Sequence, residues 1–128
     1  MDPDLNAAAR WVDDWQSSIE DRAARAKALS ERVAGLRASA RSRDGLVAVT
    51  VDSTGAVADL QLDERVRDRP AADTAHAILT VMRAAQAELA PLVRQAATEE
   101  LGTNDPTTEA IVTSYTRRFS TAPGSESD

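Results

Sequence analysis

The sequence predicts an α+β fold with a long N-terminal helix, a small antiparallel sheet of two or three strands, and a second long helix. Three patterns support this fold class: apolar residues at helical spacing over residues 4–39, valines at every second position over 46–51, and helical spacing again from about Asp73. Only 3% of the 128 residues are aromatic, although 42% are hydrophobic. One chain can therefore bury only a thin core, and a dimer that shares its core is expected.

The first helix is predicted over residues 4–39, with Asp2 or Asp4 as its cap and Pro3 in its first turn. About 36 residues at 1.5 Å each give a rod of roughly 54 Å, which is longer than a small domain is wide. Its apolar positions alternate in steps of three and four, as in a coiled-coil seam. Arg22 interrupts the seam, where a paired or solvent-reaching arginine is expected. The seam consists of Leu5, Ala8, Val12, Trp15, Ile19, Ala26, Leu29, Val33 and Leu36.

A β-hairpin is predicted after this helix. Residues 46–51 alternate with the period of a strand, and residues 52–55 form a turn in which Gly55 is free to adopt a positive φ. The return strand over residues 57–62 again has one apolar face, formed by Ala58, Leu60 and Leu62. Residues 38–43 are a candidate for a third strand. Two strands alone are marginal in water, so the hairpin needs a surface to pack against.

The second helix is predicted from about Asp73 to Gly102. Pro91 lies inside it and is expected to kink or interrupt it, because proline lacks the N–H that the helix needs. The apolar face expected for this helix is Ala75, Ile78, Leu79, Met82, Ala85 and Leu89.

A further short helix is predicted to begin at Asp105 and Pro106, a capping residue followed by a first-turn proline, and to run through Phe119. The small, polar residues that follow predict disorder. We therefore expect a domain over residues 1–102, a helical extension over 103–119 and a disordered tail over 120–128.

Composition excludes several classes of function. There is no cysteine, and the single histidine, His76, is expected to be a partly exposed helix residue rather than a metal ligand. No catalytic triad, phosphate-binding glycine loop or buried carboxylate pair is evident, so we predict a non-enzymatic protein without a cofactor or small-molecule substrate. No apolar run reaches the roughly 18 residues of a membrane span, and the acidic start lacks the apolar core of a secretory signal. A cytoplasmic protein without membrane contact is expected.

Charge is distributed unevenly along a chain whose net charge is −6. Residues 1–21 carry a net −5, residues 22–43 carry +6, and residues 44–64 return to −5. A basic block of this kind can follow a phosphate backbone and release counterions at each contact. It equally suits antiparallel pairing of the first helix with its own copy, acidic half against basic half. The residues alone leave both interpretations open.

The most specific stretch is RDGLVAVTVDSTGAVADLQLDERV, residues 43–66. It combines Gly45, the alternating valines, Gly55 and the closing Leu-Gln-Leu-Asp at 60–63. With a long helix before it and an alanine-rich helix after it, this stretch resembles the YbaB/EbfC family of bacterial nucleoid-associated proteins, over roughly residues 5–101. The helices contribute only their length, position and alanine content to the resemblance.

The resemblance implies an α-β-β-β-α protomer and a tweezer-like homodimer that is joined through its sheets, with the helices as arms. It also implies binding to double-stranded DNA with little sequence preference, at the nucleoid, and is compatible with a regulatory role. The side chains expected at the dimer interface are Val47, Val49, Val51, Ala58, Leu60 and Leu62.

The resemblance favours the basic block as the DNA-binding surface. Contact is expected at the base of the arms rather than at their acidic tips, because Arg41 and Arg43 lie close to the sheet. The first candidates for phosphate contacts are Arg32, Arg37, Arg41 and Arg43, followed by Arg22, Arg25 and Lys27.

The sequence departs from the usual family pattern in three ways: the N-terminus is acidic, Pro91 lies inside the second helix, and residues 102–128 are an extension. The acidic N-terminus and the net negative charge favour an alternative function. Actinobacterial relatives of this fold include proteins tied to type VII secretion. The alternative is therefore a protein-interaction adaptor of the same fold without significant DNA binding.

Smaller features have structural interpretations beside functional ones. Trp11 and Trp15 are expected to pack in a core or a dimer rather than to stack on bases. The cluster RVRDR at residues 65–69 is expected to be a solvated loop, with an extended basic surface as the alternative. Tyr115 and Phe119 are expected to fold back onto the core, with a partner-docking patch as the alternative.

Overall fold

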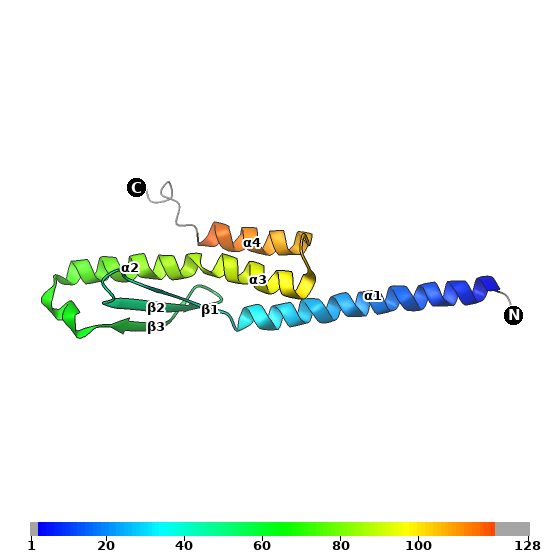
Figure 1. Ribbon diagram of the computed structural model, residues 1–128, viewed down its shortest axis with the longest axis horizontal. Coiled ribbons are helices and arrows are strands. Elements are labelled where there is room, and N and C mark those ends of the chain that lie inside the picture. The colour runs from blue at the N-terminus through cyan, green and yellow to red at the C-terminus, as the bar shows by residue number, and fades with distance from the viewer. Residues whose placement is uncertain (1–2, 120–128) are drawn as a thin grey trace.

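The computed structural model of this chain describes residues 3–119, with side chains from Leu5 onward. Figure 1 shows an α+β fold, in which a long helix precedes a three-stranded antiparallel sheet and a group of later helices. The predicted fold class is thereby confirmed for one copy of the chain. The elements are α1 (Pro3–Ala34), β1 (Arg37–Arg41), β2 (Val47–Asp52), β3 (Val57–Leu62), a 3-10 helix η1 (Glu64–Asp68), α2 (Ala71–Ala87), α3 (Leu89–Leu101) and α4 (Pro106–Arg118).

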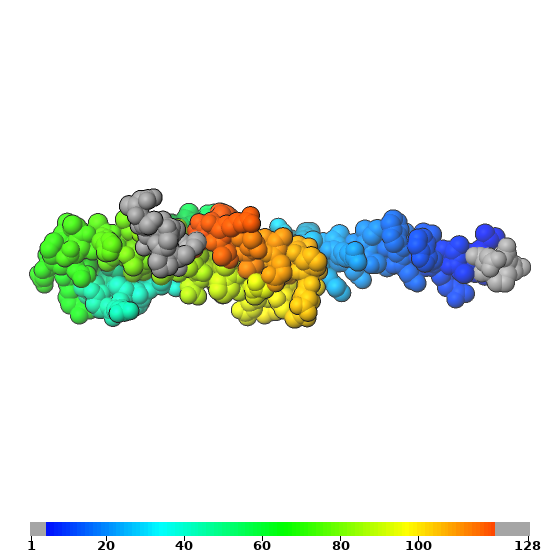
Figure 2. All heavy atoms as spheres, turned by 90° about the horizontal axis from the view of Figure 1, so that it is seen from above, coloured from blue at the N-terminus to red at the C-terminus, as the bar shows by residue number. Residues whose placement is uncertain are grey.

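The protomer is elongated. In Figure 1, α2 and α3 follow one another along one side, the sheet lies against α2, and α4 runs back beside α3. α1 contacts α3 near its own C-terminal end and then projects beyond every other element, as the narrow blue end in Figure 2 shows. Residues 7–27 are all exposed. The long N-terminal rod predicted from the sequence therefore stands mostly free of its own protomer.

α1 ends earlier than the heptad pattern predicts. The pattern indicates a helix through residue 39, but the helix stops at Ala34, so this boundary is wrong. Gly35 and Leu36 donate their N–H groups back over three residues, at 3.2 and 3.0 Å, which closes the last turn. Glycine disfavours a helix interior, and the residues after it gain strand hydrogen bonds instead. The candidate third strand is confirmed as β1, over Arg37–Arg41.

The hairpin turn between β2 and β3 takes the predicted form. Gly55 has a φ of 88°, and its N–H donates to the Asp52 carbonyl at 3.0 Å. The Asp52 carboxylate accepts hydrogen bonds from the backbone N–H groups of Thr54 at 2.9 Å and Ala56 at 3.2 Å. A single aspartate thus organises the whole turn, as short acidic side chains commonly do.

The sheet has the order β1-β2-β3, with β2 in the centre. Val47 and Val49 pair with Leu62 and Leu60 of β3, so these four residues share one face. The register shifts between Thr50 and Val51, as at a β-bulge. β3 is exposed along its whole length, because α2 covers β1 and β2.

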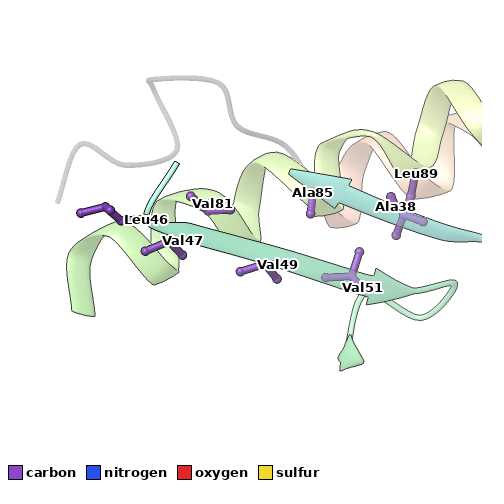
Figure 3. Packing of buried hydrophobic residues seen from close by; sticks show 8 residues of the cluster. All are labelled: Ala38, Leu46, Val47, Val49, Val51, Val81, Ala85 and Leu89. Carbon is purple, nitrogen blue, oxygen red and sulfur yellow. The ribbon is translucent and has the colours of Figure 1, made fainter. Parts of the chain in front are cut away.

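The main core lies between the sheet and α2. Val47, Val49 and Val51 are at most 1% exposed and point toward α2, as Figure 3 shows. Val81 and Ala85 of α2 meet them from the helix side. The predicted face of this helix is correct at Ile78, Met82, Ala85 and Leu89, which all belong to the cluster, but wrong at Ala75 and Leu79, which are exposed, and it omits Val81.

Pro91 interrupts the second helix, as predicted. α2 ends at Ala87 and α3 begins at Leu89, so the break lies at Glu88. A proline ring clashes with the carbonyl four residues earlier, which is that of Ala87. The break leaves Leu89 fully buried at the end of the main core.

A second, smaller cluster joins α1, α3 and α4. Leu29 of α1 is 5% exposed and packs with Ala96 and Ala97 of α3. Val33 and Ile111 cover the cluster from α1 and α4. This contact fixes the direction in which the free part of α1 projects.

α4 folds back onto the protomer, in agreement with the structural interpretation of Tyr115 and Phe119. The Tyr115 hydroxyl donates to the Ser53 carbonyl at 2.9 Å, and an Arg118 guanidinium N–H donates to the Thr54 carbonyl at 3.2 Å. Phe119 packs against the main core. Tyr115 and Phe119 therefore hold the hairpin turn. The predicted division of the chain at residue 102 stays a prediction, and the tail predicted over 120–128 lies outside the described residues.

Candidate nucleic-acid interface

The basic block of residues 22–43 is spread over three consecutive elements. Arg22, Arg25, Lys27 and Arg32 stand on α1, Arg37 and Arg41 on β1, and Arg43 in the turn before β2. Two properties distinguish the members of this block. One is exposure, and the other is whether an acidic side chain already neutralises the guanidinium.

Arg32 is held by the protein itself. Its guanidinium forms an ion pair with Glu99 and a longer one, at 3.5 Å, with Glu100. The hydrogen bond to Glu99 raises the pKa of Arg32 above its ordinary value. Arg32 therefore joins α1 to α3, and a phosphate would have to displace two carboxylates to reach it.

The RVRDR cluster is also neutralised from within. Arg65 pairs with Asp63 at 3.0 Å, Arg67 with Glu64 at 3.1 Å, and Arg69 with Asp44 of the turn between β1 and β2 at 3.3 Å. The hydrogen bond to Arg65 is the main reason that the pKa of Asp63 lies below its usual range. The cluster forms most of the 3-10 helix η1 rather than a loop, and these pairs favour a solvated surface segment over an extended basic surface.

Arg37 and Arg41 lie on the side of the sheet that α2 does not cover. Their positions alternate with Ala38 and Ala40, which face the core, so both arginines point to the open side. Both are exposed, and neither forms an ion pair within residues 3–119, although the charge of Arg37 interacts with that of Asp52, its cross-strand neighbour on β2. At an axial rise of about 3.3 Å per strand residue, they stand roughly 13 Å apart along β1.

The open side of the sheet is otherwise polar and shallow. The hydroxyls of Ser39 and Thr50 share a hydrogen bond of 2.7 Å across β1 and β2. Together with Arg41, Asp59 and Gln61 they line a depression of about 380 Å³. A shallow polar surface with an arginine edge suits a charged backbone better than an enclosed ligand.

Arg43 extends this edge at the end of the hairpin between β1 and β2. The turn around it is ordered by Asp44, whose carboxylate accepts hydrogen bonds from the Ser42 hydroxyl at 2.7 Å and from the Leu46 N–H at 3.0 Å. The Ser42 bond is the largest cause that lowers the pKa of Asp44. Arg43 itself is exposed, and the described residues offer it no ion pair.

The remaining members of the block lie on α1, away from the sheet. Arg22 and Arg25 are exposed beside a groove between α1 and the start of α4. Lys27 makes only a 4.0 Å contact with Glu31, one turn along the same helix. An exposed contact of this kind leaves Lys27 available for other ligands.

The residues expected at a dimer interface fall into two groups. The side chains of Val47, Val49 and Val51 are buried in the protomer's own core, so their prediction as interface residues is wrong (Figure 3). Ala58, Leu60 and Leu62 on β3 are exposed, and the two leucines are 43% and 45% exposed on the face that continues the core. Only the β3 group is therefore available to a second copy without unfolding the first.

The comparison with protein families agrees with the fold and with the sequence pattern. A family model described as the YbaB/EbfC DNA-binding family matches residues 11–103, which is more than half of the chain. The chain belongs to this family. Searches of curated proteins and of solved structures returned no match.

YbaB/EbfC proteins are DNA-binding and nucleoid-associated, and the matched segment contains the sheet, α2, α3 and all of the basic block. α4 lies outside the segment matched to the YbaB/EbfC family. Within residues 3–119, no helix combines the length and the apolar character that crossing a membrane requires. The same residues contain no group of three His, Cys, Asp or Glu side chains placed to hold a metal ion.

Sequence reasoning misses two features of this YbaB/EbfC chain. The first is the division of the basic block into neutralised and free arginines, because Glu99 and Glu100 lie far along the chain from Arg32. The second is the groove beside Arg22 and Arg25, which forms only when the end of α3 and the start of α4 fold against α1. The heptad seam is a sequence signal that could indicate this groove, because Ala26, Leu29 and Val33 of the seam line it.

Proposed function

We propose that this protein is a homodimeric, nucleoid-associated DNA-binding protein that acts in the cytoplasm and contacts phosphates without reading bases. Arg37, Arg41 and Arg43 are the primary contacts. Lys27, Arg22 and Arg25 are outer candidates, and Arg32 is set aside because two glutamates hold it. Binding of this kind serves DNA organisation and, through occupancy of the duplex, regulation.

One observation supports the choice of Arg37, Arg41 and Arg43 as the DNA contacts. Arg32, Arg65, Arg67 and Arg69 are paired with acids, whereas the three arginines at the open edge of the sheet are exposed and without an ion pair among the described residues. A free guanidinium gains from a phosphate without losing an internal partner. The shallow depression beside Arg41 favours contact with the DNA backbone over contact with base edges.

The uncovered face of β3 supports the homodimer. Val57, Leu60 and Leu62 are 47%, 43% and 45% exposed at the edge of the sheet. Edge strands offer unpaired backbone groups, and an apolar edge of this kind is a ready surface for pairing with a second chain. A dimer formed there brings two sets of arginines to one duplex.

The experiment is a gel-shift titration of the parent and of a variant with Arg37→Glu, Arg41→Glu and Arg43→Glu. We expect the parent to bind short duplexes of unrelated sequence with similar affinity, and to weaken by orders of magnitude between about 50 and 200 mM salt. We expect the triple variant to lose binding while it keeps the parent's mass in solution. Arg32→Glu is no suitable control because it breaks an ion pair, so Arg83→Glu, an exposed arginine on α2, serves as the matched single reversal.

A second candidate function is supported by the acidic part of α1. The acidic residues of this part would repel a phosphate backbone. Its Trp11 and Trp15 side chains are 66% and 57% exposed, and they offer an apolar surface that a protein would bind. The candidate is a protein-interaction adaptor of the same fold, as in proteins associated with type VII secretion. No binding of the parent to DNA at about 50 mM salt would favour it over the DNA-binding proposal.

A further inference from the structure

α1 carries an apolar stripe that its own protomer leaves uncovered. We call residues 3–21 the overhang. Within it, Val12, Trp15 and Ile19 are 47%, 57% and 46% exposed and stand at the i, i+3, i+7 spacing of one helix face. Trp11 stacks on Trp15 with ring centroids 6.5 Å apart, which widens the apolar surface. Such a stripe on a free helix marks a contact surface.

A groove of about 880 Å³ lies further along the same helix, between α1 and the start of α4. Its apolar lining comes from Ala26, Leu29 and Val33 of α1, together with Leu101 and Ile111. Leu29 is buried beneath α3, and the other two α1 residues face the groove beside it. α1, α3 and α4 thus form three sides of a helical bundle whose fourth position is open.

The overhang and the groove match in spacing. The α1 residues of the groove repeat the i, i+3, i+7 pattern of the overhang, two heptads later on one seam. When two such helices run antiparallel, Ile19 of each copy comes opposite Ala26 of the other, and Trp15 comes opposite Leu29. The overhang of 19 residues is roughly 28 Å long, which is enough to cover the groove.

The two surfaces also match in charge. The overhang contains five acidic residues and one arginine. Arg22 and Arg25 stand at the groove without an ion pair among the described residues. The antiparallel arrangement places Glu20 of one copy opposite Arg25 of the other and Asp21 close to Arg22. A parallel arrangement would instead place acid against acid and base against base.

We propose that the overhang of one copy occupies the groove of a second copy, and reciprocally, so that two α1 helices pair antiparallel about a two-fold axis near Arg22. This contact goes beyond the proposed DNA binding and uses neither β3 nor the arginines of the sheet edge. It assigns Arg22 and Arg25, the outer candidates for phosphate contact, to a protein contact instead. A chain with this surface and a second one at β3 has two different self-complementary interfaces, which lets dimers join into larger assemblies.

Charge reversal tests the proposal in the absence of DNA. One variant carries Arg22→Glu and Arg25→Glu, and the other carries Glu20→Arg and Asp21→Arg. We expect each variant alone to sediment with a smaller mass than the parent, because like charges then face each other. An equimolar mixture is expected to recover the parent's mass, because each reversed site meets its opposite in the other variant.

Far-UV circular dichroism of each variant checks that α1 stays helical. If both variants keep the parent's helicity and also its mass, the proposal is overturned, and a folded pair whose mixture fails to recover the mass overturns it as well. A loss of DNA binding in the sheet-edge variant would not alter either result, so this proposal and the proposed function fail separately.

Tryptophan fluorescence of the unmodified protein provides a second test that needs no variant. Both tryptophans of the chain, Trp11 and Trp15, lie in the overhang, so emission reports on this segment alone. We expect the emission maximum to move to shorter wavelength as the protein is concentrated, with the same midpoint as the change in mass. Emission that stays at the wavelength of exposed indole at every concentration, while the protein associates, would show that association leaves the overhang in water and would overturn the proposal.

Discussion

Gly55 illustrates how one residue ties an element outside the matched family segment to the hairpin. It has a φ of 88°, and a Cβ at this position would lie 2.4 Å from two ring atoms of Phe119. Gly45 also has a positive φ, 76°, but a Cβ there would meet nothing within 4 Å. An alanine at Gly45 therefore measures the stability cost of the backbone conformation alone. An alanine at Gly55 adds the cost of the clash with Phe119.

We expect Gly55→Ala to destabilise the protein more than Gly45→Ala does. Both variants place a side chain in the left-handed region, at about 1–2 kcal/mol. Only Gly55→Ala must also displace the Phe119 ring. Urea unfolding measures both, and in a Phe119→Ala background the two costs should become similar. Equal costs in the parent background would show that Phe119 does not lie against this turn.

Asp52 gives a pH dependence whose sign follows from its hydrogen bonds. The bond from the Thr54 hydroxyl, at 2.6 Å, is the main reason that the pKa of Asp52 is lowered in the folded protein. A group with a lowered folded-state pKa stabilises the protein fully above its unfolded pKa, about 3.9 for aspartate, and this stabilisation is lost as the pH falls through the folded-state value.

We therefore expect Asp52→Asn to be less stable than the parent at pH 7, with a difference that narrows below about pH 4. Urea midpoints at pH 7 and pH 2.5 check this, and Asp68→Asn, an exposed aspartate in η1, is the matched control. A difference of unchanged size at pH 2.5 would mean that the carboxylate charge does not support the turn.

At the scale of elements, the break at Glu88 decides which residues of α2 and α3 are buried against the sheet. Leu89 follows the break and is fully buried, whereas Leu79, ten residues earlier, is 45% exposed. Both residues are leucines, Leu79 on α2 and Leu89 on α3, so the same substitution at the two positions tests the effect of burial alone.

We expect Leu89→Ala to reduce the free energy of unfolding by about 2–5 kcal/mol, the usual cost of a cavity left by leucine. Leu79→Ala should change it by under about 0.5 kcal/mol in the separated protomer. Thermal or urea unfolding at low protein concentration gives both values. Similar losses at the two sites would contradict the face that α2 presents to the sheet.

The elements show how far the sequence leads and where it stops. Valine alternation and the 52–55 turn predict the hairpin because these signals are local, and Pro91 predicts the break because its ring acts on the preceding turn. The end of α1 is predicted five residues too late, since the helical period continues through Gly35 while β2 draws residues 37–41 into the sheet. Tertiary pairing overrides a local period in this case.

The candidate site shows the same limit. The sequence predicts a basic block, but it does not show that Arg32 is bound by glutamates of α3 while Arg37 and Arg41 form no ion pair among the described residues. Ion pairs between distant segments depend on the fold and leave no mark at either position. Likewise, the strand period places Val47, Val49 and Val51 on one face without showing that α2 already covers them.

The whole molecule combines a compact end with a free helix. The sheet, α2, α3 and α4 form the compact end, and α1 projects from it (Figures 1 and 2). The compact end carries the arginine edge, and the overhang of α1 carries the acidic, apolar stripe. We propose that these two ends have separate tasks, DNA contact at the sheet edge and protein contact along α1. A net charge of −6 is compatible with DNA binding because the acidic residues 1–21 lie away from the sheet edge that carries Arg37, Arg41 and Arg43.

The salt dependence of DNA binding tests this account most directly, because its slope counts phosphate contacts. Three arginines from each protomer of a dimer predict a slope of log K against log salt of about −5, at roughly −0.9 per contact. Changing Arg37, Arg41 and Arg43 to glutamine should bring the slope close to zero, whereas changing Arg83 should leave it unchanged. A parent slope near zero, or one that the triple glutamine variant retains, would contradict the assignment of these arginines to the DNA backbone.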